Sequence, residues 1–183
     1  MHLRHIISLG LCLMSLAGSG GAWAVDCPGS PWEVVTLTTQ AEVDAFPQDC
    51  DSVLSSISIS GSDITNIDSL SNITSVVGEV VITTNPVLLN IDGLVGLTSV
   101  GSLSIGGYYC CGPSQGSNAL ITNIDGLINL ISVEGSLTIG GYEGGNPALT
   151  NLDGLGSLTS VAGGFVISTD SYDFSTNQLT GGL

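Results

Sequence analysis

The residues that could do acid–base chemistry are almost all carboxylates. The chain has 16 Asp and Glu against one Arg and two His, with a formal charge of −15. Arg4, His2 and His5 all lie within the first 24 residues. The remainder therefore lacks the imidazole base of Ser-His-Asp and Cys-His catalysis, His-based zinc sites and the cationic clamps of phosphoryl transfer. Only a carboxylate pair, as in glycosidases, is left, and we expect a non-enzymatic protein without a cofactor or metal.

Four tyrosines form a second group of candidate functional residues. Tyr108 and Tyr109 follow an Ile-Gly-Gly sequence, as does Tyr142, and Tyr172 lies five residues after Ile167. Exposed aromatic rings supply rigid contact area, so these residues are candidates for binding a sugar ring or a partner protein. The alternative is that the rings pack on one another or shield an edge of the fold.

Four cysteines follow the first 24 residues. Cys27 and Cys50 flank a predicted helix, and in an exported chain we expect them to form a disulfide. Cys110 and Cys111 are adjacent, so a vicinal disulfide, a bond between two molecules and free thiols all remain open. No second cysteine pair is present to complete a zinc site with them.

The first 24 residues have the layout of a secretory signal peptide. A positive stretch around Arg4 precedes the apolar run Ile6–Ala17, and Ala22-Trp23-Ala24 fits an A-x-A cleavage site. The run is shorter than the ~20 residues of a membrane-spanning helix. We predict a mature chain of residues 25–183 that is secreted or at the cell surface, without membrane insertion. Cys12 within the run leaves a lipid anchor as an alternative. The acidic charge argues against nucleic acid as a partner.

Internal repeats predict the fold. The segment ITNIDSL at 64–70 recurs as LLNIDGL, ITNIDGL and LTNLDGL, and each copy leads to two further apolar strips. These strips are short, rich in Ile, Val, Leu and Thr, and bounded by Gly, Ser, Asn or Asp, which is typical of strands. One unit cannot bury its own apolar face, but stacked units can. We therefore predict a mainly β fold, a right-handed parallel β-solenoid, over residues 57–183.

The repeat pattern L-T-N-I-D-G-L-x-x-L-T-S-V-x-G-S-L-x-I resembles the receptor L-domain family over roughly residues 27–183. This resemblance implies a leucine-rich-repeat-like solenoid of the kind found in the ligand-binding regions of growth-factor and insulin receptors, in fungal cell-wall proteins and in secreted bacterial proteins. It is specific for the architecture and assigns no ligand-contact residue to this chain.

The repeated Asp residues would stack about 4.8 Å apart in such a fold. Because like charges repel at that distance, we expect each carboxylate to accept hydrogen bonds from the N–H groups of its own turn. Calcium that bridges the carboxylates is the alternative. The neighbouring Asn residues are expected to form a similar ladder. The Asp residues, spaced by 24, 33 and 28, and the Asn residues are Asp68, Asp92, Asp125 and Asp153, and Asn66, Asn90, Asn123 and Asn151.

The two ends of the predicted solenoid differ. Residues 25–56 are predicted to form an N-terminal cap, in which a capping box at Thr39 and Glu42 opens a helix near 39–46. Val43 and Phe46 would face the first coil. At the other end, Leu179-Thr180 resembles the start of a further coil, which leaves the last coil open. We expect further sequence or another chain to cover it, including a second copy of this chain by self-association.

These features favour a secreted or cell-surface binding module that presents one flank of a solenoid to a carbohydrate or a surface protein. A structural spacer at the cell surface, without a dedicated ligand, is the alternative. A carboxylate-only glycosidase is the weaker alternative, because a convex stack offers no cleft for its acid and base.

Overall fold

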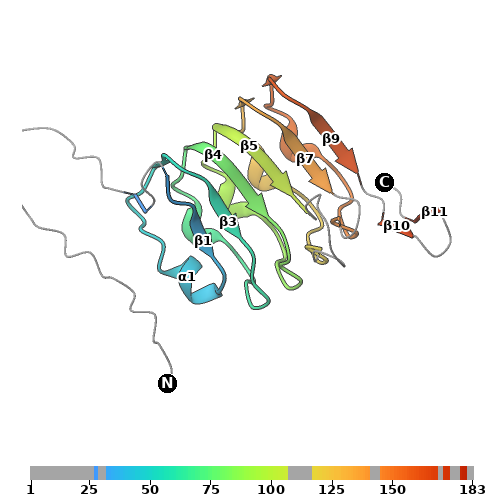
Figure 1. Cartoon of the computed structure of the whole chain (residues 1–183), viewed down its shortest axis with the longest axis horizontal. Helices are drawn as coiled ribbons and strands as arrows, with labels where there is room; N and C mark the ends of the chain where they lie inside the picture. The colour runs from blue at the N-terminus through green and yellow to red at the C-terminus, as the bar shows by residue number, and fades with distance from the viewer. Residues whose placement is uncertain are drawn as a thin grey trace, which may run out of the picture.

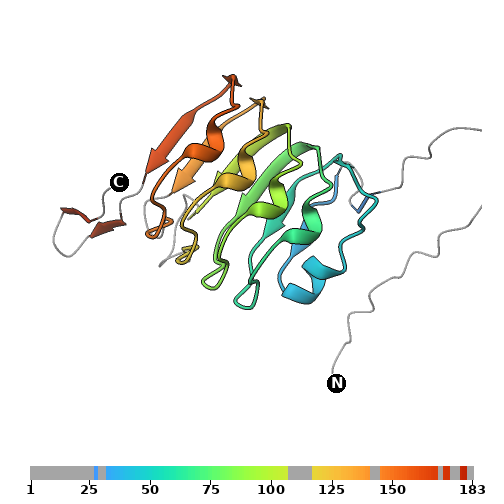
Figure 2. The ribbon, with the colours of Figure 1, turned by 180° about the vertical axis from the view of Figure 1, so that it is seen from behind.

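A computed structural model describes residues 27–28, 32–106, 117–140, 145–168, 171–173 and 178–180, the last two ranges as backbone only. The described chain is mainly β, as predicted, with a nine-stranded parallel sheet. The broad strands lie side by side in chain order from β1 to β9 (Figure 1), and short helical turns follow one another along the opposite side (Figure 2). Successive repeats therefore lie on top of one another.

Six strands form the broad part of the sheet, and each pairs in parallel with the next. In order they are β1 (Val35–Leu37), β3 (Ile57–Ile59), β4 (Ser75–Ile82), β5 (Ser99–Ile105), β7 (Leu137–Gly140) and β9 (Phe165–Ser168). In a narrower row, a short strand pairs with the first residues of β4, those of β4 pair with those of β5, and β5 is followed by two further short strands in turn. These are β2 (Ser52–Val53), β6 (Ser132–Val133) and β8 (Ser160–Val161).

The register stacks equivalent residues of successive repeats into columns that form the core. Inward-facing Ile, Val and Leu lie directly above one another, and all but those of the last unit are buried. Each unit thus covers the apolar side of the unit before it. The inward columns are Ile57-Val80-Leu103-Leu137-Phe165, Ile59-Ile82-Ile105-Ile139-Ile167 and Val53-Val76-Val100-Val133-Val161.

The first apolar strip of each repeat forms no strand in the described residues, contrary to the prediction. In the second unit, the N–H of Asp92 donates to Oδ1 of Asn90 at 3.1 Å, and the N–H of Leu94 donates to the carbonyl of Ile91 at 2.9 Å. These two bonds turn the chain into a three-residue 3-10 helix. The helices are η1 (Asp68–Leu70), η2 (Asp92–Leu94), η3 (Asp125–Leu127) and η4 (Asp153–Leu155).

The glycine after the repeated Asp allows the 3-10 helices to stack closely. A Cβ on Gly93 would overlap the carbonyl oxygen of Ile67 in the unit below, and the equivalent glycines of the next two units make the same approach. The first unit has Ser69 instead. Its carbonyl oxygen accepts a hydrogen bond from Nε2 of Gln48 at 2.9 Å, from the N-terminal segment rather than from another repeat.

The predicted helix is present as α1 (Gln40–Asp44), shorter than the predicted span. Its capping box is formed as expected, since Thr39 and Glu42 each accept a bond from the other's backbone N–H. Val43 and Phe46 are buried against the core. These contacts place α1 beside η1 and β1.

Side chains of the N-terminal segment bind the exposed backbone of the first full unit. Oε1 of Gln40 accepts from the N–H groups of Thr65 and Asn66 at 2.7 and 3.2 Å, and Nε2 donates to the carbonyl of Asn66 at 3.2 Å. The carbonyl of Gln48 accepts from Nδ2 of Asn72 at 2.6 Å. These bonds satisfy backbone groups that, in later units, face another repeat.

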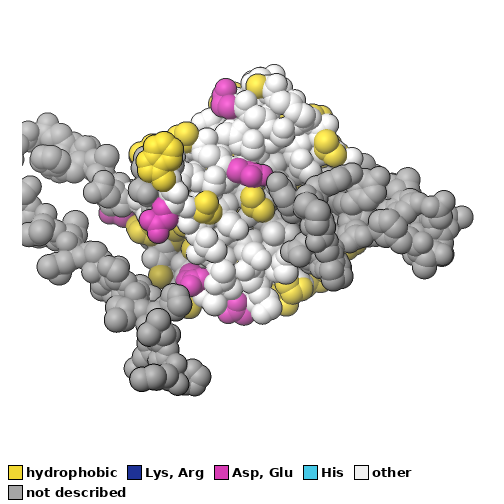
Figure 3. Space-filling view, viewed as in Figure 1, with side chains coloured by type: hydrophobic (Ala, Val, Ile, Leu, Met, Phe, Trp, Pro, Cys, Tyr) yellow, Lys and Arg dark blue, Asp and Glu magenta, His cyan; other side chains and the backbone are white. Residues whose placement is uncertain are grey.

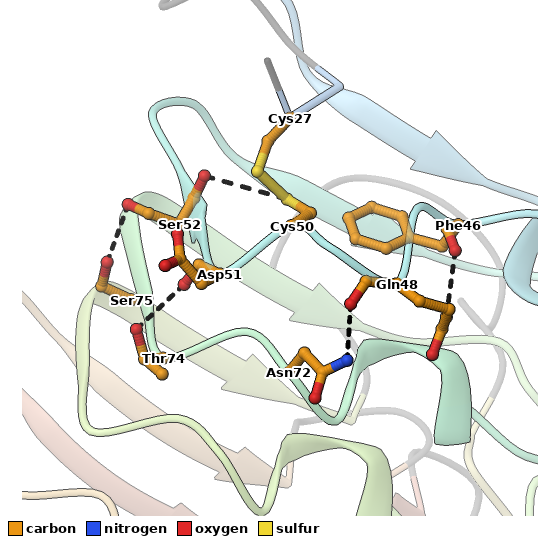
Figure 4. The surroundings of a disulfide bond; sticks show 9 residues. All are labelled: Cys27, Phe46, Gln48, Cys50, Asp51, Ser52, Asn72, Thr74 and Ser75. Atoms are coloured by element: carbon orange, nitrogen blue, oxygen red, sulfur yellow. Dashed lines mark hydrogen bonds between the residues drawn. A yellow bond between two sulfur atoms is a disulfide. The ribbon is translucent and has the colours of Figure 1, made fainter. Parts of the chain in front are cut away.

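The predicted disulfide between Cys27 and Cys50 is confirmed. It joins the start of the described chain to the segment after α1, next to the buried ring of Phe46 (Figure 4). The bond closes a loop of 23 residues in sequence separation that contains β1 and α1. Its sulfur at Cys50 also lies 3.9 Å from the carbonyl of Ser52, where β2 begins.

The last two strands are separate from the parallel sheet. β10 (Ser171–Asp173) and β11 (Gln178–Thr180) form an antiparallel pair in which Tyr172 lies opposite Leu179. Leu179 and Thr180 therefore do not repeat the arrangement of Leu149 and Thr150, which lie outside any strand. A fifth stacked unit is not formed by the described residues.

Candidate ligand-binding face

The described residues that precede the candidate tyrosines in the sequence lie at neighbouring positions of the sheet. Ile105, Ile139 and Ile167 lie in one column at the ends of β5, β7 and β9. Gly106 and Gly140 follow with φ values of 120° and 97°, a conformation that favours glycine. A Cβ on Gly140 would also overlap the carbonyl oxygen of Ser168, its partner on β9 in the next unit. The chain thus departs toward residues 107–116, 141–144 and 169–170 from one edge of the sheet.

A buried asparagine ladder holds the return ends of these loops. Asn85, Asn118 and Asn146 are at most 2% exposed. Nδ2 of Asn118 donates to Oδ1 of Asn146 at 3.1 Å, and Oδ1 of Asn118 accepts from Nδ2 of Asn85 at 3.1 Å. Each Nδ2 also donates to the carbonyl at the end of a broad strand, which for Asn146 is that of Ile105 at 3.0 Å. The ladder therefore ties the end of each loop to the strand ends below it.

This ladder was missed from the sequence, which pointed to a different set of asparagines. Asn66, Asn90, Asn123 and Asn151 instead accept from the N–H of the Asp two residues later, at 3.1 to 3.3 Å. A signal for the buried ladder was present, because Asn85, Asn118 and Asn146 each lie seven residues before a repeated Asp. The equivalent position of the first unit is Gly61, whose N–H donates to Oδ1 of Asn85 at 2.9 Å.

The repeated Asp residues do not have the predicted partners. Asp68, Asp92, Asp125 and Asp153 are exposed, and their carboxylates accept no hydrogen bond within the described residues. The turn is stabilised by the Asn side chain instead, which leaves the carboxylates in solvent. Among the described residues no three His, Cys, Asp or Glu side chains come close enough together to hold a metal ion.

The outer face of the broad sheet is mostly uncharged and made of small side chains. Figure 3 shows this face with scattered apolar and acidic groups on a surface of other side chains and backbone. Glu79 on β4 is half-buried, and Ser102 replaces it on β5. The central outward column is Thr36, Ser58, Val81, Ser104, Thr138 and Val166.

A groove of about 400 Å³ lies beside β1, at the other end of the sheet from β9. Apolar groups such as Leu37 and Phe46 line it together with the carboxylates of Glu33 and Glu42. Hydrogen bonds from the backbone and side chain of Thr38 lower the pKa of Glu42, so that this carboxylate stays ionised. The same carboxylate also accepts from the N–H of Thr39 in the capping box, and these bonds account for Glu42 without a ligand.

The candidate residues themselves fall mostly outside the described residues. Tyr108, Tyr109, Tyr142, Cys110 and Cys111 are among those not described, as is the predicted signal peptide at 1–24. Tyr172 lies in β10, of whose side chains nothing is described. The tyrosine platform and the state of the adjacent cysteines therefore stay predictions. In the part of the chain that is described, no helix has the length and apolar character needed to cross a membrane.

Comparison of the chain with protein-family models, curated proteins and solved structures finds no match.

Proposed function

We propose that this chain is an exported, non-enzymatic binding module, and that the loop-bearing edge of its sheet contacts a carbohydrate or a protein. The alignment of the loop departure points after Ile105, Ile139 and Ile167 carries this proposal. Binding residues are often found on loops held by a rigid scaffold. Here the buried asparagines supply the rigid base. The segments of unequal length that follow Ile105 and Ile139 contain Tyr108, Tyr109 and Tyr142.

The parallel pairing also supports the proposal that the fold is a right-handed solenoid of the receptor L-domain type. Equivalent residues pair in register from β3 through β9, and η1 to η4 lie next to one another in the same order. Connections between parallel strands of one sheet are right-handed in about 98% of known cases. The N-terminal disulfide is compatible with an exported chain.

The carboxylates favour binding over catalysis. A glycosidase needs two carboxyl groups held about 5 to 10 Å apart across the substrate. The four repeated Asp side chains are exposed on the 3-10 helices and have no hydrogen-bond partner within the described residues. Nothing there orients two of them as an acid and a base, so we propose that they keep the chain soluble.

The first experiment is a glycan array and a cell-surface protein array probed with residues 25–183. Affinities for any ligand found are then measured for Tyr108→Ala and Tyr142→Ala. The control is Trp32→Ala, which removes an aromatic ring that is 93% exposed near β1. We expect both tyrosine variants to bind about tenfold more weakly, since an aromatic anchor contributes more than 1 kcal/mol, with an unchanged melting temperature.

Two results would count against this proposal. Equal affinities of the tyrosine variants and the Trp32→Ala control would place the binding surface elsewhere. The absence of any ligand on both arrays would favour the structural spacer.

A further inference from the structure

The fourth unit leaves its core positions uncovered. In each of the three units before it, the six equivalent inward side chains are at most 2% exposed. In the fourth unit Phe165 is 53% exposed, and the other five are only partly buried. The same side chains that bury one another between units are therefore open to solvent at this end. The six positions of the fourth unit are Leu152, Leu155, Leu158, Val161, Phe165 and Ile167.

The backbone of β9 also offers hydrogen-bonding groups at this end. The N–H of Leu137 on β7 donates to the carbonyl of Gly164 at 2.9 Å. The backbone groups of successive residues point alternately to the two sides of a strand. The N–H and C=O groups of Gly164 and Val166 therefore point toward β7, whereas those of Phe165 and Ile167 point to the opposite edge of β9. Within the described residues no strand is hydrogen-bonded to β9 on that side, and β10 and β11 form a separate sheet near this end (Figures 1 and 2). Two N–H and two C=O groups are thus directed to the free edge.

From these observations we infer that two copies of this chain associate through their β9 edges, about a two-fold axis at Val166. In this antiparallel pair Phe165 of one copy lies opposite Ile167 of the other. The backbone N–H and C=O groups of Phe165 and Ile167 form four hydrogen bonds between the copies. The Val166 residues of the two copies lie opposite each other as a non-hydrogen-bonded pair. The six open core positions of each copy then face those of the other, which continues the unit-to-unit contact already present inside the chain.

The charges and the opposite end of the stack favour a closed pair. Residues 145–168 contain one charged side chain, Asp153, in a chain of formal charge −15. The fourth unit itself therefore presents no row of carboxylates to a second copy, and Asp170 and Asp173 follow it in the sequence. At the N-terminal end β1 is also an edge strand, but its inward side chains Val35 and Leu37 are only 9% and 5% exposed, because α1 and Phe46 pack against the core there. Head-to-tail growth would need exposed core positions at both ends of the stack, and only the C-terminal end has them, so the expected product is a dimer.

Sedimentation equilibrium of residues 25–183 from 1 to 200 µM, in 0.15 M salt, tests this inference. A monomer–dimer equilibrium is expected. Val166→Lys should weaken the dimer by roughly tenfold or more, because it places two like charges opposite each other at the axis. The matched control is Val81→Lys, since Val81 occupies the same outward column on β4, away from the edge.

A mixing experiment makes the test independent of the folding of any one variant. Val166→Lys and Val166→Glu should each be monomeric alone and should form a heterodimer when mixed, because the two-fold pairing brings opposite charges together. A monomer at all concentrations would refute the inference, as would open-ended oligomers. A dimer that Val166→Lys leaves unchanged, or failure of the mixture to associate, would show that the axis does not lie at β9. None of these results depends on the proposed ligand.

Discussion

Truncation of a buried asparagine should destabilise this protein far more than truncation of an exposed one. We consider Asn118→Ala, at the centre of the buried ladder. Oδ1 of Asn118 accepts from the backbone N–H and from Nδ2 of Asn85, at 3.2 and 3.1 Å. Its Nδ2 donates to the carbonyl of Ile82 at 2.9 Å and to Oδ1 of Asn146 at 3.1 Å. The side chain is fully buried, so water does not replace these partners.

The expected loss of stability depends on which polar groups lose their only hydrogen-bond partner when Asn118 is truncated. Nδ2 of Asn85 keeps two other backbone acceptors, and the carbonyl of Ile82 keeps the N–H of Gly106 at 2.9 Å. The backbone N–H of Asn85 and Oδ1 of Asn146 are left without a partner among the described residues. A buried polar group without a partner costs about 1 to 3 kcal/mol. We therefore expect Asn118→Ala to lower the free energy of unfolding by about 4 kcal/mol.

Equilibrium urea unfolding measures this loss, with the m-value as a check that the same surface is exposed on unfolding. The matched control is Asn123→Ala in the same unit. Asn123 is half-buried, and its side-chain oxygen accepts one bond, from the N–H of Asp125 at 3.1 Å. Its loss should cost about 1 kcal/mol. If the two variants lose equal stability at equal m-values, the ladder does not hold the loop bases, and the argument built on it fails.

The stacked glycines, the disulfide and the capping box can each be perturbed separately. Gly126→Ala should lower the free energy of unfolding by about 3 kcal/mol or more, because its Cβ would overlap the backbone of the unit below. The control is Gly156→Ala, whose Cβ would lie 3.3 Å from its nearest neighbour. It should be neutral or slightly stabilising in the same urea assay. Replacing Cys27 and Cys50 together by Ala should cost about 3 kcal/mol in the chain-entropy estimate, and an unchanged melting temperature would contradict it. Hydrogen bonds lower the pKa of Glu42 in the fold. Its contribution to the stability is therefore fully present at pH values above the ordinary pKa of 4.5, and is lost as the pH falls through the lowered pKa. Below about pH 4.5 the melting temperature of Glu42→Gln should therefore depend less on pH than that of the unchanged protein, and an unchanged profile would contradict this.

The repeat could be predicted from the sequence because stacking requires the same residue type at the same position of each unit. The column Val53-Val76-Val100-Val133-Val161 shows this constraint directly. The capping box and the disulfide could be predicted for a different reason, because each depends on the spacing of a few residues in the sequence. Local rules and a strict repeat together were enough to predict a mainly β, parallel arrangement.

The path of the chain within one unit was harder to predict. The strips before the 3-10 helices are as rich in Ile, Leu and Thr as the strands are, so propensity alone does not separate them. The difference lies in side-chain bonds such as that from the N–H of Asp125 to Asn123, which turn the backbone at a point where composition favours a strand. The buried asparagines were not recognised as a repeated position, because the segments that precede them in the sequence differ in length.

The ladder explains where this repeat tolerates insertions. The link from the last inward Ile of a unit to the next buried Asn has two residues after Ile82, twelve after Ile105 and six after Ile139. Apart from one residue beside the register shift between β4 and β5, this link accounts for the unequal spacing of the repeated Asp residues. Because each link is closed by hydrogen bonds from Asn to the strand ends below, its length can change without moving the core. Variation is thus confined to the edge where the proposed binding loops lie, and a new ligand specificity could arise there at little cost to the fold.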